Sequence, residues 1–152
     1  MPLHYLDTSA LAKRYVPEKG SVWVKNLCST EPIAISLLTV VEMPSGLARR
    51  TRSGDLTTQQ RDTIFRQFIA DTQQYTVLGV NEEMAQRAVE LVLQSPVPLR
   101  ALDALHLASA EECFRRAKQE EIATGSFVVA DQRLIQAAQW AGLSTENPEG
   151  YA

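Results

Sequence analysis

The chain has 152 residues, of which 45% are apolar, and its formal net charge at pH 7 is −3. This length and composition suit a single core, so we expect residues 1–152 to form one domain. The negative charge works against diffuse binding to a polyanion, because nonspecific nucleic-acid affinity comes largely from basic residues that neutralise phosphates. Any binding of RNA or DNA must therefore use a local site.

The cysteine pattern excludes two kinds of stabilising site. Cys28 and Cys113 are the only cysteines and neither lies in a paired CxxC motif, so the sequence supports neither a zinc site nor a disulfide framework. The chain also shows no basic leader with an apolar segment, and no apolar run of membrane-spanning length. We therefore expect a soluble cytoplasmic protein that makes no membrane contact, in a compartment where its thiols stay reduced.

The first half of the chain alternates short apolar runs with helical patterns. A buried strand is expected at residues 3–6, because such an apolar run suits the centre of a parallel sheet. Pro17 stops the helix that follows, since proline lacks an amide hydrogen. The remaining elements expected in this half are helices at residues 9–15, 22–27, 37–52 and 57–74 and a strand at residues 33–36.

Pro44 lies inside the helix expected at residues 37–52, for which Ser36 is the expected cap. A proline there removes the hydrogen bond to the carbonyl of Val40, at a cost of about 3 kcal/mol if nothing compensates. We therefore predict a kink beside Glu42.

The second half continues the alternation of strands and helices. Asn81 is expected to cap a helix with an inner face of Met84, Ala88, Leu91 and Val92, and Ser95-Pro96-Val97-Pro98 forms a rigid connector. Strand and helix alternation predicts an α/β protein with a mostly parallel central sheet. The further elements expected are strands at 75–80 and 126–130, a helix from 99 to about 118, and a last helix around 134–138 closed by Gly142.

Four acids fall at related positions in these elements. Asp7 and Asp131 each end a strand, while Glu42 and Asp103 each lie near a helix start. The carboxyl ends of parallel strands open onto the crevice where α/β proteins bind ligands, so the four acids can converge there. Carboxylates held together repel and take up protons unless a cation compensates them, and Mg²⁺ or Mn²⁺ prefers such oxygen ligands. Metal-assisted phosphodiester hydrolysis is the expected chemistry.

A simpler interpretation makes these acids helix caps. Asp7 or Ser9 can cap the first helix and Asp131 can cap the last. Weighing the four acids together, we assign the cap to Ser9 and the metal-ligand role to Asp7. Ser9 also stands where a phosphoaspartyl hydrolase usually has a second aspartate, which disfavours that enzyme class.

The segments around the acids carry a family resemblance. They read LDTSAL at 6–11, VE at 41–42, LDALHLA at 102–108 and FVVADQRL at 127–134. In this order they resemble the PIN-domain family, and most closely its VapC-type toxin ribonucleases. The resemblance spans nearly the whole chain, and no single motif carries it alone.

This resemblance implies a three-layer α/β/α sandwich and an endoribonuclease, the toxin of a type II toxin–antitoxin pair. It implies RNA as substrate, a small cognate antitoxin as inhibitor, and a homodimer. The implied Mg²⁺ or Mn²⁺ site has Asp7, Glu42, Asp103 and Asp131 as catalytic residues, with Asp7, Asp103 and Asp131 as metal ligands.

Two departures from the family pattern keep a second interpretation open. Val129 stands where the family often has a threonine, and Pro44 follows the second acid closely. The alternative is a catalytically weak PIN-derived module that only binds a protein partner. Arg100 and Arg133 flank two acids and either contact RNA or antitoxin or balance local charge. His106 is expected to pack in a helix interface and is left out of the catalytic set.

Overall fold

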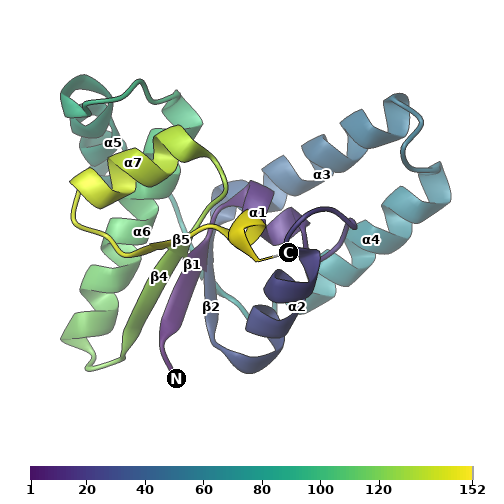
Figure 1. Ribbon diagram of the computed structural model, residues 1–152, viewed down its shortest axis with the longest axis horizontal. Coiled ribbons are helices and arrows are strands. Elements are labelled where there is room, and N and C mark those ends of the chain that lie inside the picture. Colours follow the sequence, from purple (N-terminus) through teal and green to yellow (C-terminus); the bar gives the residue numbers. More distant parts are fainter. Residues whose placement is uncertain (152) are drawn as a thin grey trace.

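Five parallel strands form one sheet in the computed structural model, which describes residues 1–151, and helices cover both faces of this sheet (Figure 1). The strand order is β3-β2-β1-β4-β5, and every neighbouring pair is parallel. The α/β class and the parallel sheet are confirmed. The strands are β1 Leu3–Leu6, β2 Ile33–Ser36, β3 Thr76–Leu78, β4 Thr124–Val128 and β5 Thr145–Glu146.

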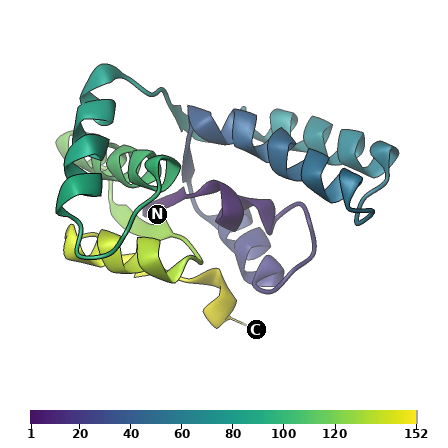
Figure 2. The same cartoon turned by 90° about the horizontal axis from the view of Figure 1, so that it is seen from above.

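Two separate apolar clusters define the layers. One joins the sheet to helices of the second half of the chain, and the other joins it to helices of the first half. This is the expected α/β/α sandwich, from which the α3–α4 hairpin projects (Figure 2). The layer from the first half of the chain contains α1 Thr8–Ala12, α2 Ser21–Thr30, α3 Leu37–Arg52 and α4 Thr58–Asp71. The layer from the second half contains α5 Glu82–Gln94, α6 Ala101–Gln119 and α7 Gln132–Trp140. A 3₁₀ turn, η1 Pro148–Gly150, lies near the C-terminus.

Strand β1 is central because both of its faces are apolar. The side chain of Tyr5 belongs to the cluster on the α6 side, and that of Leu6 to the opposite cluster. Phe127 on β4 packs edge-on against Tyr5, with ring centroids 5.5 Å apart. Burial of a strand on both faces is typical of the centre of a parallel sheet.

Strands β1 and β4 are neighbours at the middle of the sheet. From β1 the chain continues to β2 and β3 toward one edge, and from β4 it continues to β5 at the other edge. Such a reversal of strand order opens a crevice at the carboxyl ends of the two strands. Asp7 follows β1 directly, and Asp131 lies shortly after β4. The topology therefore brings together two acids that are far apart in the sequence.

Several expected boundaries differ from the structure. Strand β4 begins at Thr124, two residues earlier than expected, and its register with β1 shifts between Leu3 and Tyr5. At this irregularity the amide of Ser126 donates to Nδ1 of His4, at 3.0 Å. A Cβ at Gly125 would lie 2.5 Å from the imidazole of His4, so any larger residue there would have to displace this ring.

Other expectations differ from the structure where the sequence carries no clear local pattern. Val92 was expected on the inner face of α5, but its side chain is 42% exposed. Strand β5 and the η1 turn were not expected, because an edge strand of two residues has no periodicity to read. Helix α1 ends at Ala12, earlier than expected, although turns continue to Val16.

Helix α3 has the expected bounds and the expected Ser36 cap, whose side chain accepts from the amide of Leu38. The helix continues without a break through Pro44. A bend of its axis at that turn remains a prediction. Across residues 1–151, every helix is too short or too polar to cross a membrane.

Thr57 provides a test of local capping. Its side chain accepts from the amide of Gln60 while the Gln60 side chain accepts from the amide of Thr57, which is a complete capping box at the exposed start of α4. Thr57→Ala is expected to lower the free energy of unfolding by about 1 kcal/mol, because one amide loses its acceptor. Urea denaturation measures this change.

Ser9→Ala is the matched control for Thr57→Ala, because Ser9 is exposed and caps no helix in the structure. Its free energy of unfolding should stay within about 0.5 kcal/mol of the wild-type value. An equal loss in both variants would contradict the assignment of the caps.

Candidate active site

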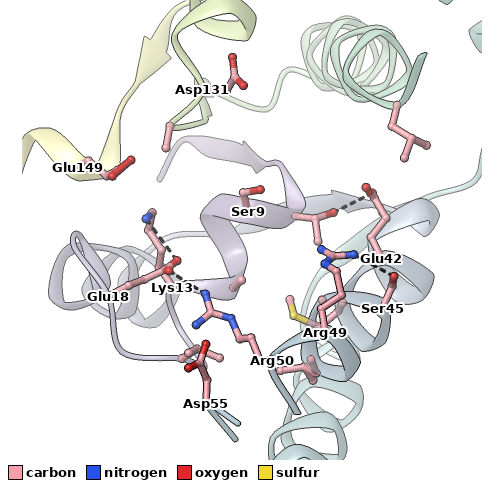
Figure 3. Close-up of a pocket in the computed structure, with 18 of the residues that line it drawn as sticks. Ser9, Lys13, Glu18, Glu42, Ser45, Arg49, Arg50, Asp55, Asp131 and Glu149 are labelled. Carbon is pink, nitrogen blue, oxygen red and sulfur yellow. Dashed lines mark hydrogen bonds and ion pairs between the residues drawn. The ribbon is translucent and has the colours of Figure 1, made fainter. Parts of the chain in front are cut away.

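A cleft of about 1030 Å³ opens at the carboxyl ends of β1 and β4 (Figure 3). Helix α1 contributes Thr8 and Ser9 to its wall, helix α3 contributes Glu42, and the segment after β4 contributes Asp131. Arg100, just before α6, completes this part of the lining. Side chains from four separate segments therefore face one space.

Asp7, which follows β1, and Asp103 are not among the described residues that line this cleft. At Asp7 the structure also corrects the role given to Ser9. The Oδ1 atom of Asp7 accepts from the amide of Ala10 at 2.8 Å, and its carbonyl accepts from the amide of Leu11. Asp7, and not Ser9, is thus the N-cap of α1. The reason is geometric, because Asp7 is the last extended residue before the helix and Ser9 already lies inside it.

Burial makes the Asp7 carboxylate costly to ionise. The side chain is 7% exposed, and burial raises its pKa from 3.8 to about 6. The negative charges of Asp103 and Glu42 act in the same direction, while His106 and the amide of Ala10 oppose them. The carboxylate of Asp7 therefore lies near the carboxylates of Asp103 and Glu42, an arrangement that favours a cation to offset their negative charge.

Asp103 and Asp131 extend this acidic group. Asp103 lies in the first turn of α6, and its pKa is raised by burial and then by the charge of Asp131. Asp131 is exposed and caps α7, accepting from the amides of Arg133 and Leu134 at 2.9 and 3.1 Å. Asp131 is thus the N-cap of α7, as in the simpler interpretation of this acid, and its charge acts on Asp103.

Glu42 is held by two hydrogen bonds from other elements. The hydroxyl of Thr8 donates to its Oε1 at 2.9 Å, and Nε2 of His106 donates to the same atom at 2.6 Å. Burial acts to raise the pKa of Glu42, but the bonds from His106 and Thr8 outweigh it and the net shift is downward. Glu42 therefore stays ionised while Asp7 resists ionisation.

His106 is buried, as expected of an interface residue, but it also connects the core to the site. Its Nδ1 shares a hydrogen bond of 3.0 Å with the hydroxyl of Tyr5. Burial raises the pKa of Tyr5, so this hydroxyl stays neutral and can donate or accept. The spacing from Asp103 was a usable signal, because residues three apart share a helix face.

The metal-site prediction can be compared with this donor set. Across residues 1–151, no three histidine, cysteine, aspartate or glutamate side chains form a group that could hold a metal ion. The charges of Asp103 and Glu42 nevertheless act on Asp7, and the charge of Asp131 acts on Asp103. Mg²⁺ in proteins typically takes one or two carboxylates and keeps several waters, so an open acidic set fits such an ion in its chemistry.

Three residues singled out from the sequence lie in different surroundings. Val129 is fully buried in the apolar cluster that includes Leu107 and Leu134, so its side chain contributes to the core. Arg100 lines the cleft and its charge acts on Asp103. Arg133 is exposed in the first turn of α7.

Comparisons with known proteins bear on the family and the fold of the chain. The family model described as PIN domain matches residues 4–136. A comparison with curated proteins found no match.

Solved structures share the fold at low sequence identity. FitAcB from Neisseria gonorrhoeae is 18% identical with a TM-score of 0.65, over 95% of this chain and 97% of that one. VapBC2 from Rickettsia felis, bound to a promoter DNA fragment, is 16% identical with a TM-score of 0.60, over 95% and 98% of the two chains. A toxin–antitoxin complex from Klebsiella pneumoniae is 19% identical with a TM-score of 0.59, over 95% and 97%.

Proposed function

Because the chain belongs to the PIN-domain family, we propose that it is a metal-dependent endoribonuclease, the toxin of a type II toxin–antitoxin pair. The observation that carries this proposal is the buried carboxylate of Asp7, which shares a neighbourhood with Asp103 and Glu42 at the sheet's crevice. A carboxyl group whose pKa is raised by burial, and further by acidic neighbours, is typical of a functional site.

Asp7, Asp103 and Asp131 would hold Mg²⁺ or Mn²⁺, and Glu42 completes the catalytic set. When bound, such an ion lowers the pKa of a water and offsets negative charge on the phosphate that is cut. The protein's own contribution is to hold these acids in place. The amide of Ala10 orients Asp7, and Thr8 and His106 fix Glu42 in its ionised form.

We extend the proposal to partners. The structures similar to this chain include a toxin–antitoxin complex and VapBC2 bound to DNA from its promoter. A small cognate antitoxin is therefore the proposed inhibitor of this chain, and a homodimer the proposed assembly. RNA is the proposed substrate, and a bound cation would add positive charge to a chain whose formal net charge is −3.

A partner-binding module without strong catalysis is the second candidate. The observation in its favour is that the acids within residues 1–151 form no group that could hold a metal ion. Calorimetry with Mn²⁺ separates the two candidates. Binding that disappears in Asp103→Asn supports the nuclease, and no heat at millimolar Mn²⁺ supports the module.

The proposed activity predicts metal-dependent cleavage. The purified protein should cut RNA from a panel of transfer, ribosomal and messenger RNA when Mg²⁺ or Mn²⁺ is present, as followed by gel electrophoresis. EDTA should stop the reaction and excess Mn²⁺ should restore it, because the acids alone cannot offset the phosphate charge.

The EDTA step also identifies contaminating ribonucleases that need no metal, since their cleavage persists in EDTA. Absence of cutting across the whole panel in Mn²⁺ would contradict the proposed activity.

A further inference from the structure

The cleft contains a buried cation that the acidic site does not use. Lys13 is only 5% exposed, yet it lines the cleft. A buried ammonium is costly unless it is paired, so its surroundings indicate what it binds. Figure 3 shows Lys13 on the α1 wall, on the same side of the cleft as Glu18 and Glu149.

The pairing of Lys13 inside the protein is incomplete. Its Nζ donates to Oε1 of Glu18 at 3.3 Å. The other oxygen of Glu18, Oε2, accepts from Nη2 of Arg50 at 3.0 Å. The carboxylate of Glu18 is thus shared by two cations, and these three side chains together carry a net positive charge. An ammonium has three donors, and the protein's hydrogen bonds within residues 1–151 use one of those on Lys13.

Two arginines of α3 also line the cleft. Arg50 reaches toward Glu18 from the wall opposite Lys13, whereas the guanidinium of Arg49 lies beside Glu42 and Ser45 (Figure 3). The acids Glu42 and Asp131 lie toward the other part of the cleft, while Glu18, Asp55 and Glu149 line the part that holds Lys13 and Arg50. The lining of the cleft is therefore acidic in sum, and Lys13 and Arg50 are the cations on this side that can bind a phosphate.

Helix α1 fixes the separation between Asp7 and Lys13. Asp7 is the N-cap of this helix and Lys13 is its C-cap. At a rise of 1.5 Å per residue the two backbones lie about 9 Å apart along the axis. Lys13 is thus placed for a phosphate beside the one that is cut.

We propose that Lys13, together with Arg50, binds an RNA phosphate next to the scissile one. The proposal rests on the proposed function in taking RNA as the ligand. The competing explanation is a structural ion pair between Lys13 and Glu18 that holds the turn at residues 13–18. The two explanations differ in whether RNA affinity depends on Lys13.

The test measures binding and not cleavage. Fluorescence anisotropy of a short fluorescein-labelled single-stranded RNA, in EDTA and over a range of salt, is compared for the wild-type chain and Lys13→Met. Lys13→Met should weaken binding by about 10-fold, as expected for a lost charged hydrogen bond. The slope of log K against log salt should become shallower by about 0.7, the value for one phosphate contact on a single strand.

Three further variants make the result decisive. Lys19→Met removes an equal charge from an exposed residue outside the cleft lining and should leave affinity and slope unchanged. Lys13→Arg should retain most of the binding. Glu18→Gln breaks the ion pair but leaves Lys13 charged, so it should bind RNA at least as tightly as wild type.

Equal weakening in Glu18→Gln and Lys13→Met would overturn the proposal in favour of the structural ion pair. The proposal would also be overturned if the slope of log K against log salt were the same in Lys13→Met as in the wild-type chain, or if the wild-type chain bound no RNA. Failure of the nuclease proposal is recognised separately, because cleavage would then be absent while binding still depends on Lys13.

Discussion

Asp7→Asn is expected to reduce RNA cleavage by about 1,000-fold or more, which corresponds to a loss of about 4 kcal/mol of transition-state stabilisation. An asparagine has nearly the same shape, but its amide carries no charge to hold a cation. Asn is also as good an N-cap as Asp, so the amide of Ala10 keeps its acceptor and the fold should persist. Initial rates in Mn²⁺ measure the effect.

The control for Asp7→Asn is Asp62→Asn, which removes one negative charge from α4, outside the residues that line the cleft. Its rate should equal that of the wild-type chain. Asp103→Asn should fall with Asp7→Asn, because the two charges act on each other. Persistent cleavage of RNA by both Asp7→Asn and Asp103→Asn would contradict the proposed metal site.

The stability of the metal-free chain is expected to decrease as pH rises from about 4 to about 6, through the titration of Asp7. Its pKa is raised from 3.8 to about 6 in the folded state, so the folded chain binds more protons than the unfolded chain in this window. Stability then falls as pH rises through the window and stays level above it. Urea denaturation in EDTA at a series of pH values measures the decrease.

Asp7→Asn isolates this contribution, because Asparagine does not titrate. Since burial raises the pKa of Asp7 from 3.8 to about 6, the free energy of unfolding at pH 7 should be higher in Asp7→Asn than in the wild-type chain by up to about 3 kcal/mol. Near pH 4 the two chains should converge. Parallel pH profiles for the two chains would contradict the assigned pKa.

Together these two results would identify a trade-off at Asp7. The residue would lower the stability of the metal-free chain and would be retained for activity, as is common where an active site requires buried charge. Addition of Mn²⁺ should reduce the difference in stability, since a ligand that binds the folded state stabilises it.

The sequence by itself determined the elements whose signals are local. The apolar run at Leu3–Leu6 predicted the central strand, and Ser36 and Asn81 were predicted as caps and are observed as such. The positions of Asp7 and Asp131 after strands were readable for the same reason, because a parallel sheet aligns the carboxyl ends of its strands. Neighbouring residues suffice for each of these conclusions.

Only the tertiary structure decided which side chains meet. The bond between His106 and Glu42 joins residues 64 apart in the chain, and the burial of Lys13 depends on the packing of α1 against its surroundings. The cap at Asp7, in place of Ser9, followed from the residue at which extended backbone turns into helix. These features depend on packing and backbone geometry, which neither residue spacing nor composition specifies.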